Sequence, residues 1–132
     1  MEDRQGTLRL GQASFAPRQL LVMAIVNRTP DSFYRPGVTW DETAAMDRVH
    51  QAVAGGADIV DIGGVPAAPG TDVDPAEEIR RTAGFIAVVR AAYPDVVISV
   101  DTWRHEVARA ACAAGATSRC EQGRRARRRR RG

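Results

Sequence analysis

The chain contains three nearly continuous apolar runs, each followed by polar residues or glycines. The runs begin at Leu20, Ala57 and Val96, so that their starts are 37 and 39 residues apart. Such runs are typical of strands buried on both faces, as in a parallel sheet. The even spacing leaves room for one helix after each strand, which restricts the chain to a repeated strand–helix fold.

Helix signals occupy the intervals between the runs. In the first interval, Thr39 to Glu42 forms the pattern of a capping box with Thr39 as the N-cap, and Gly55-Gly56 ends the apolar periodicity. In the second, Asp74-Pro75 is a strong start signal, and the pattern continues to Tyr93-Pro94. These signals predict two helices with well-defined starts and stops.

A third helix is predicted from Arg104 to Ala114, with Gly115 as its stop signal. The resulting order β-α-β-α-β-α suits an open doubly wound sheet or a (β/α)8 barrel, both of the α/β class. A complete barrel needs about 250 residues. The 132 residues of this chain therefore have room for the first three βα units of a barrel.

Composition divides the chain into three segments: a polar lead-in at 1–19 that we expect to form a short strand or plug, a folded domain at 20–116, and an Arg-rich tail at 117–132. The first 116 residues carry 11 Arg against 15 acidic residues, whereas the tail carries 8 Arg against one Glu. The tail lacks Val, Ile, Leu and Phe, so we expect it to be disordered. Because the basic charge belongs to the tail, nucleic-acid binding by the folded domain is not expected.

Several function classes are excluded by composition. All 19 basic residues are Arg, which excludes a catalytic lysine within these residues. Two cysteines are too few for a disulfide framework or a four-cysteine zinc site. No apolar stretch approaches the roughly 18 residues of a membrane span, and the start of the chain does not resemble a signal peptide. We therefore expect a cytoplasmic protein with no membrane partner.

Polar side chains lie at or near the carboxyl ends of the three predicted strands, where parallel α/β folds place their functional sites. Asn27 and Asp101 follow the first and third strands, and Asp61 precedes Gly63-Gly64 in the second. An amide oxygen can bind a hard cation, and a carboxylate can accept two N–H donors of a heterocycle. Asn and Asp also end strands for purely structural reasons, because both favour turns.

Three ordered motifs resemble the dihydropteroate synthase family. They are Met23 to Phe33 with its Asn-Arg-Thr-Pro-Asp-Ser-Phe segment, Ala54 to Gly70 with its Asp-Ile-Gly-Gly segment, and Ile98 to Thr102. The resemblance covers about residues 20–116 and implies a (β/α)8 TIM barrel. It also implies a transferase of folate biosynthesis that condenses dihydropterin diphosphate with p-aminobenzoate and uses Mg²⁺ as its cofactor.

The resemblance assigns roles to five residues. It implies that Asn27 holds Mg²⁺ and the diphosphate, that Asp101 binds the pterin ring, and that Thr29, Asp31 and Asp61 contribute to substrate binding. The long segments 28–38 and 63–73 would close over this site. The resemblance also implies homodimerisation, which full-length members of the family show.

This sequence departs from the family pattern in several places. Val65 to Ala68 stands where the family reads Glu-Ser-Thr-Arg, Arg35 replaces an Asp, and Cys120 stands where a pterin-binding Asn is expected. The pattern is more similar to the divergent second copy found in some actinobacteria. The change to an Arg-rich tail indicates truncation by a reading-frame change in a GC-rich gene, which predicts that the chain is inactive alone.

Two alternatives remain open at this point. One is a non-catalytic homologue that keeps the rim of the barrel but binds another ligand, which the loss of the second-loop residues suggests. The other is a chain that binds anions or nucleic acid through the Arg-rich tail, since about seven net charges can support salt-sensitive binding.

Overall fold

The computed structural model describes residues 7–11, 13–16, 19–29, 41–65 and 73–120. The elements in chain order are β1 (Leu8–Leu10), β2 (Ala13–Phe15), β3 (Met23–Asn27), α1 (Glu42–Ala54), β4 (Ile59–Gly63), α2 (Pro75–Ala92), β5 (Val97–Asp101), α3 (His105–Ala114) and β6 (Ser118–Cys120).

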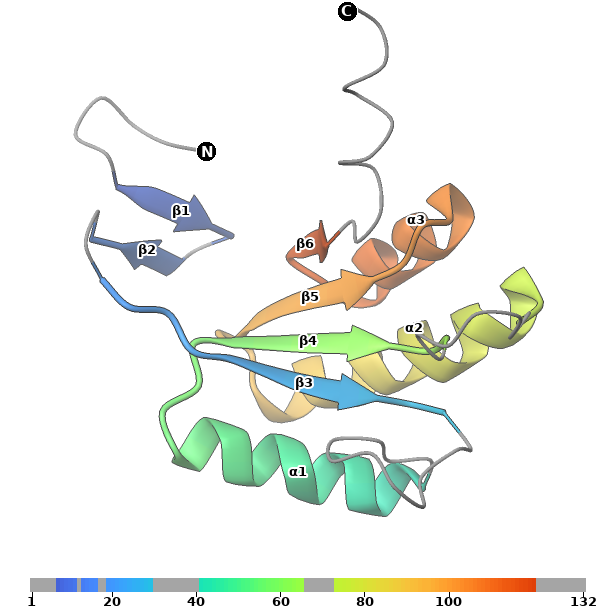
Figure 1. Ribbon diagram of the computed structural model, residues 1–132, viewed down its shortest axis with the longest axis horizontal. Coiled ribbons are helices and arrows are strands. Elements are labelled where there is room, and N and C mark those ends of the chain that lie inside the picture. The colour runs from blue at the N-terminus through green and yellow to red at the C-terminus, as the bar shows by residue number, and fades with distance from the viewer. Residues whose placement is uncertain (1–6, 12, 17–18, 30–40, 66–72, 121–132) are drawn as a thin grey trace, which may run out of the picture.

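Strands β3 to β6 form a four-stranded parallel sheet in the order β3-β4-β5-β6. The three helices lie along one face of this sheet, and the antiparallel hairpin β1–β2 lies beyond the amino ends of its strands (Figure 1). The sequence order of the sheet strands equals their spatial order, as in the wall of a barrel. The predicted three βα units are therefore confirmed, and a fourth strand follows them.

The outer face of the sheet packs against the helices and forms the core. Val60 and Ile98 are fully buried there, together with Val26, Ile62 and Val100 of the next row. From the helices, the buried partners in this cluster are Ala45, Val49, Phe85, Ile86, Val89 and Ala111. The apolar runs of the sequence thus supply one side of a single core between sheet and helices.

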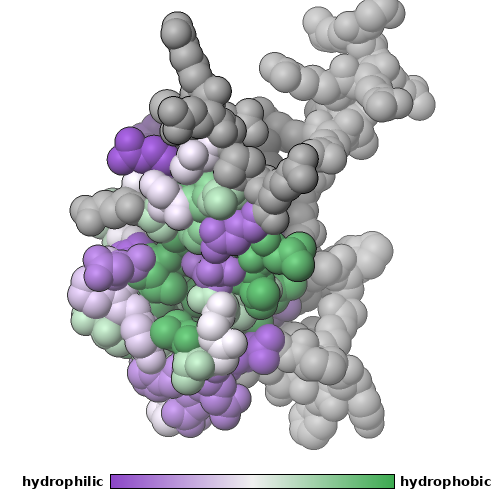
Figure 2. Space-filling view, turned by 90° about the vertical axis from the view of Figure 1, so that its left-hand side faces the viewer, coloured by the Kyte–Doolittle hydropathy of each residue, from purple (hydrophilic) through white to green (hydrophobic). Residues whose placement is uncertain are grey.

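The prediction that the first apolar run is buried on both faces is wrong. Leu20 and Val22 precede β3 and are 92% and 58% exposed, while Met23 and Ile25 within β3 are 42% and 41% exposed. Met23 and Ile25 alternate with the buried Val26, so they belong to the face of the sheet opposite the helices. Figure 2, a view from the amino ends of the strands, shows hydrophobic residues gathered in the middle of this end of the molecule.

The helix starts illustrate one confirmed prediction and one error. The Asp74 carboxylate accepts a hydrogen bond from the Ala76 N–H at 2.8 Å, and Pro75 opens α2, as the sequence predicts. Helix α1 instead uses Asp41 as its N-cap, which accepts from the Thr43 N–H at 3.2 Å. Asp41 has the same capping chemistry as Thr39 and lies directly before the first helical residue; Thr39 lies outside the described residues.

Strand β6 lies within the segment expected to be a tail from residue 117 onward. The backbone of β6 pairs in parallel with β5, with Ser118 opposite Ser99 and Cys120 opposite Asp101. Backbone hydrogen bonds to a neighbouring strand form without apolar side chains, which is why the composition of this segment concealed a strand. The expected disordered stretch at 121–132 lies outside the described residues.

Within the described residues, no helix is long and apolar enough to cross a membrane. The expected lead-in at 1–19 contains the β1–β2 hairpin, which places Phe15 in a buried position. Gly11 at the turn approaches Thr117, because a Cβ at Gly11 would lie 2.9 Å from Thr117 Cγ2. The hairpin therefore contacts the sheet near the start of β6.

Candidate functional site

The carboxyl ends of the strands bring two predicted site residues into one row. Asn27 of β3 is the register partner of Gly63 in β4, and Gly63 is the partner of Asp101 in β5. The three residues occupy the inner face of the sheet, opposite the core, because they alternate with the core residues Val26, Ile62 and Val100. The sequence predicts Asn27 and Asp101 at the ends of the first and third strands, and the register joins them across a single glycine.

Gly63 determines how closely Asn27 and Asp101 approach each other. A Cβ built on Gly63 would lie 3.2 Å from Asn27 Oδ1, 3.7 Å from Asp101 Cβ and 3.9 Å from Asp101 Oδ2. Both polar side chains therefore lean over the backbone of the glycine from opposite sides. A backbone hydrogen bond continues the pairing of β3 with β4 past Asn27, because the Arg28 N–H donates to the Gly63 carbonyl at 2.7 Å.

Asp61 occupies the row below, two residues before the end of β4. It is the register partner of Ile25 and of Ser99, and the Ser99 hydroxyl donates to Asp61 Oδ1 at 2.6 Å. The Asp61 side chain is buried, with 1% exposure. Because β4 continues to Gly63, Asp61 lies one inward-facing row below the end of the strand.

The carboxyl groups of both rows are harder to ionise than free aspartate. Burial raises the pKa of Asp61, and the hydrogen bond from Ser99 opposes part of this shift. The pKa of Asp101 is raised to about 6, first by burial and then by the negative charges of Asp61 and Glu78. Asp101 can therefore change its charge near neutral pH and can bind a ligand as an acceptor once it is ionised.

A buried ion pair supports this end of the sheet. Arg104, the first residue before α3, donates through Nη1 to Glu78 Oε1 at 3.0 Å and also to the Val73 carbonyl. Glu78 in α2 is fully buried, and its Oε2 has no hydrogen-bond partner among the described residues. The pair joins the starts of α2 and α3 behind Asp101.

Neither Glu78 nor Arg104 is predicted from the sequence as part of this site. Arg104 was interpreted only as the start of a helix, and Glu78 follows Glu77 in an acidic first turn, where charged residues are common on exposed surfaces. The helical spacing of Glu78 with Thr82 and Phe85 on the buried side of α2 was the available signal. A charge on an apolar face needs a partner, and Arg104 provides it.

Of the remaining predicted site residues, Thr29 is described by the structure and Asp31 is not. Thr29 is 2% exposed and lies two residues after Asn27, the last residue of β3. Asp31 lies outside the described residues, as do Arg35 and most of the second long segment. Trp103 follows Asp101 by two residues, is 67% exposed, and stacks on the Arg104 guanidinium with 4.5 Å between Arg104 Cζ and the ring centroid.

The oxygen atoms of the row have the chemistry of a partial magnesium site. Magnesium prefers oxygen ligands and often combines one or two protein ligands with water and substrate phosphates. The Asn27 amide oxygen and the Asp101 carboxylate are hard donors that lean toward the same glycine. The described residues contain no group of three or more His, Cys, Asp or Glu arranged to hold a metal. Of these two donors, Asn27 Oδ1 is the one that could hold a magnesium ion.

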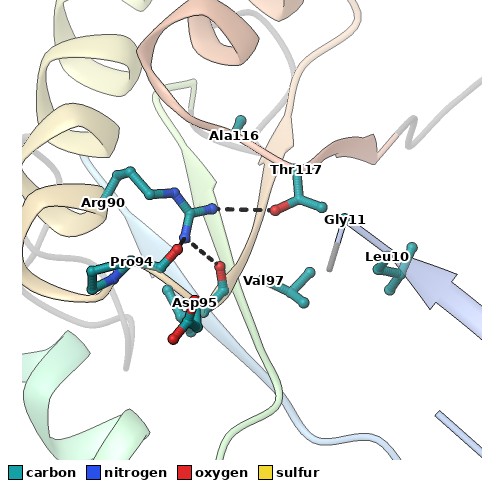
Figure 3. A pocket seen from close by; sticks show the side chains of 9 residues that line it. Leu10, Gly11, Arg90, Pro94, Asp95, Val97, Ala116 and Thr117 are labelled. Atoms are coloured by element: carbon teal, nitrogen blue, oxygen red, sulfur yellow. Dashed lines mark hydrogen bonds between the residues drawn. The ribbon is translucent and has the colours of Figure 1, made fainter. Parts of the chain in front are cut away.

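The opposite end of the sheet contains a cavity with a different character (Figure 3). It has a volume of about 350 Å³ and lies between the hairpin turn and the start of β5. Arg90 projects toward it and donates to the carbonyls of Pro94 at 2.9 Å, Val96 at 2.7 Å and Gly115 at 2.8 Å. Those bonds connect the end of α2 to the segments before and after β5. We therefore interpret this end of the sheet as stabilising the fold.

Comparison with known proteins identifies the family. The family model described as "Pterin binding enzyme" matches residues 23–118. An "Inactive dihydropteroate synthase 2" from Mycobacterium tuberculosis is 64% identical over 96 residues, which cover 73% of this chain and 30% of the relative. A dihydropteroate synthase from Streptococcus pyogenes is 45% identical and matches 72% of this chain and 36% of its own length.

Solved structures agree on the fold. A Xanthomonas albilineans dihydropteroate synthase with 4-aminobenzoic acid superposes with a TM-score of 0.74 at 37% identity, over 87% of this chain and 43% of that chain. A Burkholderia cenocepacia dihydropteroate synthase complexed with 7,8-dihydropteroate gives a TM-score of 0.70 at 33% identity, over 87% and 37%.

The matches define both the fold and the extent of the likeness. The sheet and helices form part of the TIM barrel of dihydropteroate synthases, and this chain spans about a third of the length of the curated relatives. The similarity extends from β3 to the start of β6, which includes the row of Asn27, Gly63 and Asp101. By these matches the chain belongs to the family of pterin-binding enzymes.

Proposed function

We propose that this chain is a dihydropteroate synthase-like pterin-binding unit that does not complete the condensation reaction by itself. The observation that carries the proposal is the row at the carboxyl ends of β3, β4 and β5. There the Asn27 amide and the Asp101 carboxylate lean over Gly63 from opposite sides. A single small ligand can touch both groups.

The Asp101 carboxylate would bind the pterin. A pterin ring carries a guanidine-like edge with two parallel N–H donors, and one carboxylate can accept both. The burial of Asp101 strengthens such bonds, because less water competes for the carboxylate. Asp61 and Ser99 form the layer below, and their hydrogen bond keeps the Asp61 carboxylate in a fixed position.

Asn27 would hold the diphosphate end of the ligand. When bound, Mg²⁺ would neutralise charge on the diphosphate and make it a better leaving group. Asn27 would bind the ion through its amide oxygen and donate from its side-chain NH2 group to the phosphate, and Thr29 would lie beside it. Asp31 is assigned to the same end by the family motif alone.

The relatives support the choice of ligand. The Burkholderia cenocepacia enzyme was solved with 7,8-dihydropteroate and the Xanthomonas albilineans enzyme with 4-aminobenzoic acid. For this chain, dihydropterin diphosphate and p-aminobenzoate as substrates, homodimerisation and a cytoplasmic location are parts of the proposal. The Mycobacterium tuberculosis relative is named as inactive, and it favours a chain that binds without catalysis.

Titration with a pterin, followed by NMR chemical shifts, tests the proposal. We expect the wild-type chain to bind pterin and Asp101→Ala to bind at least about tenfold more weakly, which corresponds to about 1.4 kcal/mol. Asp95→Ala is the matched control, because Asp95 is an exposed carboxylate before the opposite end of β5. Equal affinity of Asp101→Ala and wild type would refute pterin binding by this row.

Catalysis is tested separately. The chain alone should form no dihydropteroate from dihydropterin diphosphate and p-aminobenzoate in the presence of Mg²⁺. Its described residues supply Asn27 and Asp101 from two strands of a barrel whose other walls would complete the site. Product formation by the isolated chain would overturn the non-catalytic part of the proposal.

A further inference from the structure

The glycine in the middle of the site row is packed differently from the glycine that follows it. A side chain on Gly63 would enter the space between Asn27 and Asp101, whereas one on Gly64 would meet α2, 3.0 Å from Thr82 Cγ2 and 3.2 Å from Arg81 Cβ. The two neighbours therefore point to opposite sides of the sheet. The first faces the candidate site and the second faces the helices.

The backbone of Gly63 does not itself require glycine. Among the described glycines, those with positive φ are Gly11, Gly56 and Gly115, so Gly63 lies in a region that other residues adopt. Alanine is at least as compatible with a strand interior as glycine. The reason for glycine at this position must therefore be found in the space above it.

That space is small and polar. The nearest atom to a Cβ at Gly63 would be Asn27 Oδ1 at 3.2 Å, and Asp101 contributes its Cβ and Oδ2 within 4 Å. A contact of 3.2 Å is tighter than ordinary van der Waals contact, so the Asn27 side chain would have to move by a few tenths of an ångström. A methyl group would also place an apolar surface between two groups that bind polar ligands.

We propose that Gly63 is a positioning residue of the candidate site, because its missing side chain lets the Asn27 amide and the Asp101 carboxylate converge on one ligand. This inference rests on the proposed pterin-binding function for its ligand, although the convergence can be measured without ligand. A larger residue would leave both binding groups present and yet hold them apart.

The test compares Gly63→Ala, Gly64→Ala and wild type in the full 132-residue chain. Without ligand, Gly63→Ala should shift the NMR signals of the Asn27 side-chain amide and the Asp101 carboxyl carbon. It should keep a melting temperature close to that of wild type. Gly64→Ala should lower the melting temperature, because its methyl group presses on α2, and should leave the two site signals nearly unchanged.

With pterin as the probe, Gly63→Ala should bind at least about tenfold more weakly than wild type, and Gly64→Ala should bind like wild type at temperatures where it is folded. Unchanged Asn27 and Asp101 signals together with wild-type affinity in Gly63→Ala would overturn the inference. If the wild-type chain binds no pterin, the proposed function fails, while the ligand-free signals still decide whether Gly63 sets the approach of the two side chains.

A folding defect in Gly63→Ala would also be informative. If the methyl group acts by pressing on the amide above it, the double variant Asn27→Ala/Gly63→Ala must recover the fold, since the nearest atom to the new Cβ has been removed. Failure of the double variant to fold would show that glycine is needed for another reason, and this result would overturn the inference.

Discussion

The two faces of the central sheet are built from the same strands but differ in almost every physical property. On the outer face, Val26, Ile62 and Val100 are fully buried against the helices. On the inner face, their chain neighbours Ile25 and Asp101 are partly exposed, and Asn27 and Asp61 add polar groups. The outer face stabilises this chain, and the inner face carries the candidate site.

The comparison also shows that burial on the inner face increases from the sheet edge inward. Met23 and Ile25 of the edge strand β3 are 42% and 41% exposed, whereas Asp61 and Ser99 on the next two strands are 1% and 5% exposed. The polar residues Asp61 and Ser99 are thus more buried than the apolar residues Met23 and Ile25 of the edge strand. Such an inversion is typical of a functional site and not of a stabilising core.

The largest expected effect is the difference in unfolding free energy between two truncations, one of an isoleucine on the outer face and one of an isoleucine on the inner face. Ile62→Ala should lower the free energy of unfolding by about 2–5 kcal/mol, because it opens a cavity in the core. Ile25→Ala should change it by no more than about 1 kcal/mol, since Ile25 is already 41% exposed. Urea unfolding followed by circular dichroism measures both values, and similar losses would contradict the contrast between the faces.

An intermediate effect is expected from pH. The pKa of Asp101 is raised from 3.8 to about 6 in the folded chain, so the folded state binds more protons between these values than the unfolded state does. Stability conferred by protonated Asp101 is therefore present at low pH and is lost as pH rises from about 4 to 6. Two pKa units correspond to roughly 3 kcal/mol, and partial solvent exposure reduces the expected loss to about 1–2 kcal/mol.

Asp101→Asn isolates this contribution. The variant should show a smaller fall in unfolding free energy between about pH 4 and 6 than wild type, because the amide does not titrate. The raised pKa of Asp61 contributes in the same direction in both proteins, so the difference between them reports Asp101. Identical pH dependence in the two proteins would show that Asp101 ionises as freely as an exposed aspartate.

Polar substitutions on the exposed face of β3 should have the smallest effect on stability and a clear effect on self-association of the chain. Met23→Ser and Ile25→Ser remove apolar surface that the described residues leave exposed on β3. We expect each change to alter unfolding free energy by no more than about 1 kcal/mol and to reduce concentration-dependent self-association, because exposed apolar edge strands promote pairing between chains. Sedimentation velocity over a range of concentrations measures this, and unchanged association would assign it to another surface.

Some elements followed from local sequence alone. The start of α2 at Asp74-Pro75 and the end of α3 at Gly115 were predictable, because capping and stop signals act over a few residues. The three strand–helix units were predictable from the spacing of the apolar runs. The start of α1 was misplaced because two residues with capping chemistry, Thr39 and Asp41, lie within one turn of each other.

The candidate site was only partly predictable. Asn27 and Asp101 were found because each follows an apolar run, and parallel strands bring their carboxyl ends together. The depth of Asp61 was missed, since a run of hydrophobic letters does not show at which residue pairing stops. Glu78 and Arg104 were missed because their partnership joins residues 26 positions apart and exists only after α2 and α3 have packed.

The sequence by itself determined the strand–helix repeat, the family motifs and the identity of the two polar strand ends. These features depend on residue type and short-range spacing, which a linear sequence contains in full. The tertiary structure decided the register that places Gly63 between Asn27 and Asp101, the buried ion pair beside them, and the exposure of the inner face of β3. Those features depend on distances between segments that are far apart in the chain, and packing alone sets them.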